Sequence, residues 1–128
     1  MTQMLAAVTV VVDDYDAAIA YYVGVLGFSL LEDTHLGATK RFVRVGPAEG
    51  GCSLLLARAV TDEQRARIGD QTGGRVALFL HTDDVDRDFA AYRSRGVDFI
   101  EGLRDEVYGR VVVFRDVYGN LWDLVQPT

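Results

Sequence analysis

The residue with the clearest chemical potential in this sequence is Asp123, which lies inside the apolar stretch NLWDLVQ near the C-terminus. The residues DVYGN before it are typical of a tight turn, and the stretch itself is typical of a strand. A carboxylate on a buried strand is expensive to desolvate unless it has a partner. Asp123 is therefore expected to bind a metal, to pair with a cation, or to line a wet pocket.

The two histidines, His35 and His81, are the other side chains that could bind a metal or transfer a proton near neutral pH. His35 falls in the turn-like stretch EDTHLGATK, and we expect it on the surface. His81 ends the strand-like stretch RVALFLH, in which alternation places Ala77, Phe79 and His81 on one face. We favour a solvated histidine at the rim of a site over the alternative, a ligand contact or proton shuttle.

Charge and composition restrict the classes of partner. The chain has 128 residues and a formal net charge of −6, which disfavours nucleic acid and anionic membranes as partners. The single cysteine, Cys52, cannot form an internal disulfide, and the apolar run MLAAVTVVV is far shorter than the ~20 residues of a membrane span. These features predict a cytoplasmic protein that binds neither nucleic acid nor membranes.

Two segments 70 residues apart carry the same pattern. Asp13, Asp14 and Asp16 in VVDDYDAAIAYYVGVLGF correspond to Asp83, Asp84 and Asp86 in HTDDVDRDFAAYRSRGV. In both, large apolar residues follow at helical spacing, the acidic residues suit a helix N-terminus, and a glycine stands where the helix would end. The pattern predicts two amphipathic helices, and we interpret them as parts of a duplicated module.

Strand-like stretches surround both helices in the same order. One precedes each helix and three follow it, which gives β-α-β-β-β twice. The halves span about residues 1–58 and 74–128, and a connector at about 59–73 contains a short helix that Thr61 would cap. The sequence therefore predicts an α+β fold, a single domain of residues 1–128 built from two tandem βαβββ modules.

The helix pattern VxDxxxAxxYYxxxLGF and the terminal pattern DxxGNxWDL, set in paired βαβββ modules, resemble the vicinal oxygen chelate superfamily. This group includes glyoxalase I, fosfomycin and bleomycin resistance proteins, and extradiol dioxygenases, and the resemblance covers essentially the whole chain. It implies a curved, cup-like mixed sheet with helices on the outer face. It also implies a homodimer, with cups completed between halves or between protomers.

The resemblance further implies four metal-ligand positions, which fall here on Ala7, Leu54, Ala77 and Asp123. Only Asp123 can bind a metal, whereas a catalytic divalent ion typically takes three or more protein ligands. His81 would lie roughly 13 Å along its strand from position 77, which is too far to replace a ligand. We therefore predict no metal and no cofactor.

The predicted site is a metal-free cup for a small organic molecule, cationic or rich in hydrogen-bond donors. Strand alternation from the former ligand positions assigns it the residues Ala7, Thr9, Ala77, Phe79, His81, Leu121 and Asp123. A structural role for Asp123, such as pairing with an arginine, is the competing interpretation and is slightly favoured. Alternation sends Trp122 to the opposite side, beneath the helices. Arg41, Arg44 and Arg110 lie in strands expected to form cup walls, but the sequence leaves their facing open.

Three functions remain open. The first, which we favour, is a metal-independent binding protein similar to bleomycin resistance proteins, which sequester a drug. The second is a glyoxalase-like lyase or a dioxygenase, which the three lost ligand positions oppose. The third is a metal-free enzyme that uses Asp123 or His81 in acid–base catalysis. No catalytic residue and no ligand identity is assigned from the sequence.

Overall fold

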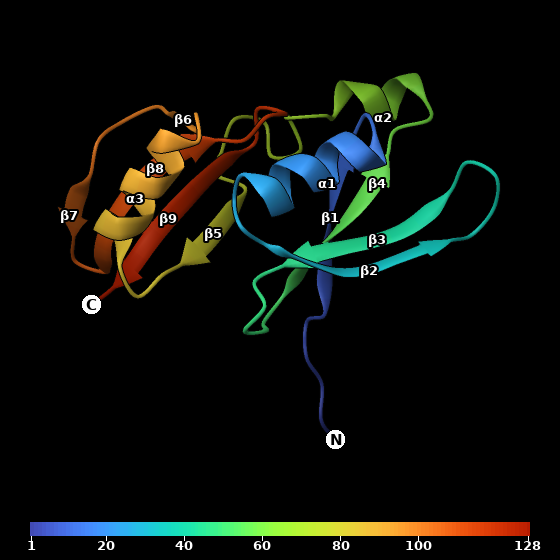
Figure 1. The fold of residues 1–128 in the computed structure, drawn as a ribbon. Helices are drawn as coiled ribbons and strands as arrows, with labels where there is room; N and C mark the ends of the chain where they lie inside the picture. The colour runs from blue at the N-terminus through green and yellow to red at the C-terminus, as the bar shows by residue number, and fades with distance from the viewer. The chain divides into compact units, whose positions relative to one another are not determined.

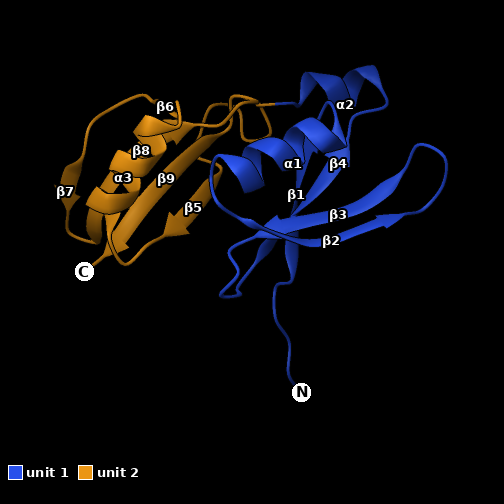
Figure 2. Cartoon of the chain, viewed as in Figure 1, with its two compact units in different colours: residues 1–68 blue, residues 69–128 orange.

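The structure, a computed structural model, describes all residues from 1 to 128. The chain forms two compact units, residues 1–68 and residues 69–128 (Figure 2). Each unit contains one sheet and one long helix, in the mixed α+β arrangement that the sequence predicts.

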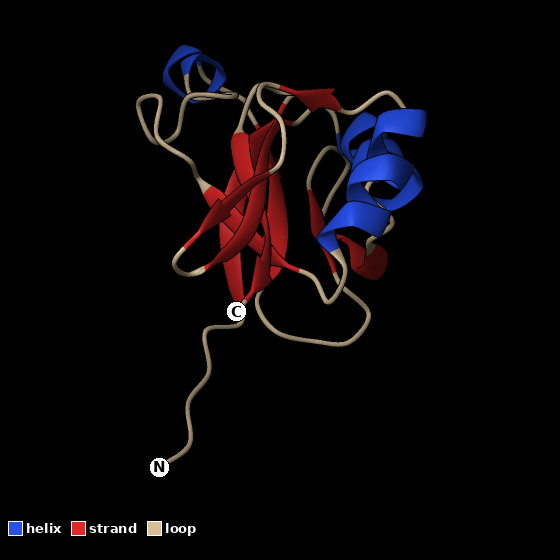
Figure 3. Ribbon diagram, turned by 90° about the vertical axis from the view of Figure 1, so that its left-hand side faces the viewer, coloured by secondary structure: helices blue, strands red, loops and turns tan.

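Unit 1 holds a four-stranded sheet in the order β1-β4-β3-β2 (Figure 1). Its elements are β1 (Ala7–Val12), α1 (Tyr15–Gly24), β2 (Ser29–His35), β3 (Arg41–Gly46), β4 (Ser53–Arg58) and the short helix α2 (Asp62–Ala66). Strands β1 and β4 are parallel, and the other pairs are antiparallel. Residues 1–6 precede β1 as an exposed extended segment (Figure 3).

Unit 2 repeats this order with one additional strand. Its elements are β5 (Leu78–His81), α3 (Val85–Ser94), β6 (Asp98–Phe99), β7 (Arg104–Glu106), β8 (Gly109–Arg115) and β9 (Leu121–Pro127). The sequence predicted three strands after this helix, whereas the structure has four. The chain leaves the sheet after Phe99 and returns at Arg104, so that β6 and β7 pair with different parts of β8.

Both long helices begin and end as the repeated pattern predicts. Asp14 and Asp84 each accept a hydrogen bond from the backbone N–H three residues on, at 2.8 and 3.0 Å. These bonds satisfy N–H groups that have no partner within the helix. Gly27 and Gly96 then adopt positive φ values of 80° and 84°, which reverse the chain at low steric cost.

Each helix covers one face of the sheet in its own unit. Helix α1 packs on β3 and β4, and α3 packs on β8 and β9. Alternate strand residues face the helix and form the core, among them Val10, Val12, Val43, Val45, Leu56, Val112, Phe114 and Leu124. We call the opposite sheet face the inner face of the unit, and strand alternation assigns every other residue to it.

An arginine joins the helix to the sheet in both units. Arg41 of β3 pairs with Asp16 of α1 at 2.8 Å and with Asp33 of β2 at 2.6 Å. Arg110 of β8 likewise pairs with Asp86 of α3 at 3.3 Å and with Asp105 of β7 at 3.1 Å. Both arginines thus face the helices, which decides a facing that the sequence left open.

Candidate functional site

Asp123 lies in the middle of the inner face of unit 2. Strand β9 runs between β5 and β8, and Asp123 is paired with Phe79 on one side and with Val113 on the other. The residue is only 6% exposed. Its Oδ1 atom is buried and has no hydrogen-bond partner. Because an unsatisfied buried acceptor destabilises the fold, a donor supplied from outside the chain would be bound favourably.

The surroundings of Asp123 change its acidity. Burial raises the pKa of its carboxyl group, and the positive charge of Arg104 opposes this rise only in part. Arg104 stands opposite Val111 on the same inner face, but its guanidinium is held by Glu101 and by Glu106, the latter at 2.9 Å. Asp123 therefore has a nearby cation without an ion pair, and it keeps its capacity to accept a hydrogen bond.

The structure brings four predicted residues, Phe79, His81, Leu121 and Asp123, together on this face. Phe79 is 66% exposed although it is a large apolar side chain beside a buried carboxylate. His81 is exposed at the end of β5, two register pairs beyond Phe79 and opposite Val125. Leu121 lies two residues before Asp123, at the other end of the face.

The remaining predicted residues lie beside this group or in unit 1. Ala77 immediately precedes β5, and its backbone N–H donates to the carbonyl of Leu121 at 2.9 Å. Ala7 and Thr9 lie on the inner face of β1 in unit 1, with Ser53 and Leu55 as their partners on β4.

The pairing between strands corrects the assignment of Leu54 to a former metal-ligand position. Each unit has three residues that are paired across neighbouring strands of its inner face. In unit 1 they are Thr9, Leu55 and Arg44, and they correspond in unit 2 to Phe79, Asp123 and Val113. Leu55, not Leu54, is thus equivalent to Asp123. Leu54 pairs with Val8 and Val45 and is buried on the helix side. The assignment of Leu54 to a former ligand position is wrong by one residue, and in a strand one residue changes the face.

Arg44 is the functional candidate that the sequence left open. It lies on the inner face of unit 1, where its Nη1 donates to Ser53 Oγ at 3.1 Å and its Nε lies 3.5 Å from Glu32 Oε1. The stretch RFVRVG contained the signal. Arg41 shares its parity with the apolar Val43 and Val45, whereas Arg44 alternates with them.

A second buried aspartate, Asp116, explains the DVYGN turn. Its carboxylate accepts hydrogen bonds from the backbone N–H groups of Tyr118 and Asn120, the side-chain amide of Asn120, and the indole N–H of Trp122, all at 3.0–3.1 Å. Trp122 is 3% exposed and stacks on Phe114, so its predicted position beneath the helix is confirmed. The motif therefore folds the β8–β9 turn and fixes the strand that carries Asp123.

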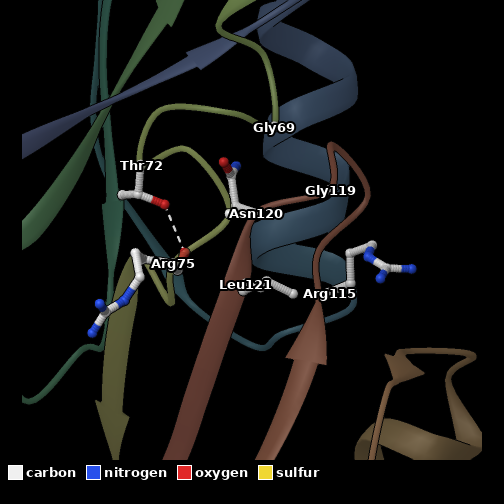
Figure 4. Close-up of a pocket in the computed structure, with 8 residues that line it drawn as sticks. Gly69, Thr72, Arg75, Arg115, Gly119, Asn120 and Leu121 are labelled. Carbon is white, nitrogen blue, oxygen red and sulfur yellow. Dashed lines mark hydrogen bonds between the residues drawn. The ribbon is translucent and has the colours of Figure 1, made fainter.

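A shallow pocket of about 120 Å³ lies at the end of sheet β5-β9-β8-β6 (Figure 4). It is lined by Gly69, Thr72, Gly74, Arg75, Arg115, Gly119, Asn120 and Leu121. Thr72 Oγ1 closes the loop by donating to the carbonyl of Arg75 at 2.6 Å. The side chains of Arg75 and Arg115 extend in different directions in this view, so they do not converge on a common anion. The volume is below the ~300 Å³ typical of drug-sized ligands.

Comparison with known proteins identifies the family. The model of the Glyoxalase/Bleomycin resistance protein/Dioxygenase superfamily matches residues 4–124. The chain belongs to this superfamily. A protein of Shewanella frigidimarina (strain NCIMB 400) whose function is uncharacterized is 49% identical over 98% of this chain and 95% of its own length.

Two solved structures have the same fold over nearly their whole length. TnmS3, an antibiotic binding protein from Streptomyces sp. CB03234, is 32% identical with a TM-score of 0.79, covering 100% of this chain and 98% of its own. A superfamily member from Sphaerobacter thermophilus DSM 20745 is 28% identical with a TM-score of 0.82, covering 98% of each chain. None of the helices of this protein is both long enough and apolar enough to cross a membrane.

The residues present do not fit the divalent metal of the metal-dependent superfamily members. Asp123 has Phe79 and Val113 beside it in the sheet. The equivalent position in unit 1 is Leu55, whose neighbour Arg44 would repel a metal cation. No group of three or more His, Cys, Asp or Glu side chains is arranged so that it could hold a metal ion.

Proposed function

We propose that this protein is a metal-independent, cytoplasmic binding protein that holds a small organic molecule on the inner face of unit 2 and sequesters it. The observation that carries the proposal is the Asp123 carboxylate, which is buried beside the exposed ring of Phe79 and has an unpartnered oxygen. A mostly apolar surface with a few fixed polar groups is typical of small-molecule sites.

The chemistry of the face defines the class of ligand. A hydrogen-bond donor or a cationic group would satisfy Asp123, and an apolar or aromatic ring would cover Phe79. The antibiotic-binding relative TnmS3 supports this proposal, since it shares the fold over the full length of the chain. An antibiotic or a metabolite of similar size is thus the proposed ligand, and resistance to it the proposed consequence.

The first test is to find the ligand and to exclude a metal. Native mass spectrometry of the purified protein, followed by thermal-shift screening of an antibiotic library, should yield compounds that raise Tm. Elemental analysis of the same sample should give well below one Zn, Ni, Fe or Mn per chain. A stoichiometric metal whose removal abolishes ligand binding would contradict the proposal.

The second test uses variants of the site. Asp123→Asn should weaken binding of a cationic or donor-rich ligand by about tenfold or more, because a hydrogen bond to a charged group contributes roughly 1.5–3 kcal/mol. Phe79→Ala should weaken it about fivefold and leave the fold stable, because the side chain is already exposed. Isothermal titration calorimetry measures both effects.

A matched control variant separates the loss of the Asp123 contact from the loss of one negative charge. Asp70→Asn removes the same charge from an exposed residue of the 69–74 loop in unit 2 and should leave affinity unchanged. Equal affinities of the wild type, Asp123→Asn and Phe79→Ala for every ligand found would refute this site.

A metal-free enzyme is the second candidate function. The raised pKa of Asp123 favours it, because a carboxylate whose pKa moves toward neutrality is a better general base. His81 lies on the neighbouring strand two register pairs away from Asp123, roughly 7 Å along it. Conversion of a bound ligand by protein treated with a chelator, followed by liquid chromatography and mass spectrometry, would assign this function. Recovery of unchanged ligand supports the binding protein.

A further inference from the structure

We infer that the inner face of unit 1, taken by itself, binds a planar acidic molecule and that Arg44 determines the preference for the acid. This inference rests on the proposed function, because it extends the binding of a small organic molecule to the inner face of unit 1. The molecule bound there is planar and largely apolar, and it carries a carboxylate or a comparably acidic group.

Arg44 is held in a fixed orientation on this face. It is paired with Leu55 of β4 and with Glu32 of β2. Its Nη1 donates to Ser53 Oγ at 3.1 Å, and this hydroxyl in turn donates to the carbonyl of Ala6 at 2.9 Å. Ser53 is itself only 2% exposed. The guanidinium plane is therefore positioned before any ligand arrives, which lowers the entropy lost on binding.

The charge of Arg44 is only weakly neutralised. Its one carboxylate partner is Glu32, whose Oε1 lies 3.5 Å from Nε, and the two side chains are 29% and 41% exposed. Partly exposed ion pairs at this distance contribute little to stability. A guanidinium has five N–H donors, and the contacts with Ser53 and Glu32 occupy two of them. Donors thus remain for a bidentate bond to an incoming carboxylate.

Two other strand arginines are more fully neutralised than Arg44. Arg41 and Arg110 face the helices, and each is neutralised by two aspartates. The residue at the position of Arg44 in unit 2 is Val113, which pairs with Asp123 as Arg44 pairs with Leu55. The module therefore folds with an apolar residue at this position, and the charge of Arg44 serves another purpose.

The neighbours of Arg44 favour a planar ligand. Phe42 lies two residues before Arg44 on the same inner face, and Leu55 lies beside it. Guanidinium groups stack on aromatic faces as well as pairing with carboxylates. The inner face of unit 1 thus offers a cation beside apolar surface.

The test uses three probes that share one ring system: 2-naphthoate, 2-naphthamide and 2-(aminomethyl)naphthalene. The wild type should bind 2-naphthoate about tenfold more tightly than 2-naphthamide, and this preference should decrease as salt is added. Arg44→Gln should abolish the preference while changing the affinity for 2-naphthamide less than about twofold. Arg44→Lys should keep only part of it, because lysine retains the charge without the planar fork.

Two further variants test whether the affinity for 2-naphthoate can also be raised and whether the effect is specific to Arg44. Glu32→Gln should raise the affinity for 2-naphthoate a few-fold, because it removes the competing carboxylate. Arg67→Gln, which removes the same charge from an exposed residue next to α2, should leave the ratio of the two affinities unchanged. Circular dichroism melts identify any variant that is not folded.

The outcomes distinguish this inference from the proposed function. Binding of 2-naphthamide and 2-(aminomethyl)naphthalene without tighter binding of 2-naphthoate overturns the role of Arg44 and leaves the proposed function intact. An unchanged ratio of the affinities for 2-naphthoate and 2-naphthamide in folded Arg44→Gln also overturns the role of Arg44 and leaves the proposed function intact. Failure of all three probes to bind the wild type overturns the planar ligand and this inference together. Loss of the preference in Arg44→Gln, with Asp123→Asn retaining it, supports the assignment.

Discussion

Two buried aspartates seven residues apart illustrate how partners decide the role of a side chain. Asp116 is 4% exposed, and its carboxylate is bonded by backbone, amide and indole N–H groups. Asp123 is 6% exposed, and its Oδ1 has no donor. The first stabilises a turn. The second destabilises the chain by itself, and we propose that a ligand supplies the missing donor.

The raised pKa of Asp123 predicts a stability that depends on pH. A carboxyl group whose folded pKa lies above its unfolded value of 3.8 binds its proton more tightly in the folded state. The contribution of Asp123 to the free energy of unfolding is fully favourable below pH 3.8 and is lost as pH rises through the folded pKa. Asp123→Asn, which cannot ionise, should therefore have a higher Tm than the wild type at pH 7.

Thermal unfolding between pH 3 and pH 8 measures this difference. The advantage of Asp123→Asn over the wild type should shrink as pH falls toward 3.8, whereas the exposed Asp70→Asn should track the wild type throughout. A wild type that is more stable than Asp123→Asn at pH 7 would indicate a structural role for this carboxylate.

At the scale of elements, the repeated arginine contacts hold each long helix to its sheet. In unit 1, Arg41 contacts Asp16, Asp33 and the ring of Tyr15, with its Cζ atom 5.3 Å from the ring centre. In unit 2, Arg110 contacts Asp86 and Asp105 but is more exposed, at 37% against 15% for Arg41. The same interaction should therefore contribute more to stability in unit 1.

Arg41→Gln should destabilise the protein by about 1–2 kcal/mol and Arg110→Gln by less, because solvent screens the more exposed pair. Urea unfolding at pH 7 measures both values. Arg41 holds the pKa of Asp33 below its usual 3.8, so this stabilisation is present above pH 3.8 and is lost as pH falls through the lowered pKa. The effect of Arg41→Gln should consequently diminish below pH 3.8. Equal losses for the two variants would contradict the ranking by exposure.

At the scale of the whole molecule, the chain forms two compact units, and β1 or β5 forms one edge of the sheet in each unit. Exposed edge strands are sites of pairing with other chains unless they are covered. The resemblance to superfamily members with shared cups leads us to propose a homodimer.

Light scattering on a sizing column should give about twice the chain mass of 14.1 kDa at roughly 50 μM protein. Dilution to about 1 μM is the control for a weak, concentration-dependent association. A mass of one chain at the higher concentration would exclude the dimer. In that case the inner face of unit 2 would have to bind ligand within a single chain.

Local sequence patterns were enough to predict the type of every helix and strand except β7, and the presence of one unusual carboxylate. Helix caps at Asp14 and Asp84, glycines at helix ends and the DVYGN turn depend on neighbours a few residues away, so local patterns predict them. Alternation within one strand likewise assigned Trp122 and Asp123 to opposite faces.

Tertiary structure alone decided the register between strands. The repeat offset is 70 residues in the helices, but Leu55 precedes Asp123 by only 68, because the connecting loops of the two units differ in length. Counting along the sequence therefore placed Leu54 on the inner face, and only the pairing of β4 with β1 and β3 shows that Leu55 lies there. The partners of Arg41, Arg44 and Asp123 were decided in the same way, because long-range backbone pairing, not local sequence, sets which side chains meet across a sheet.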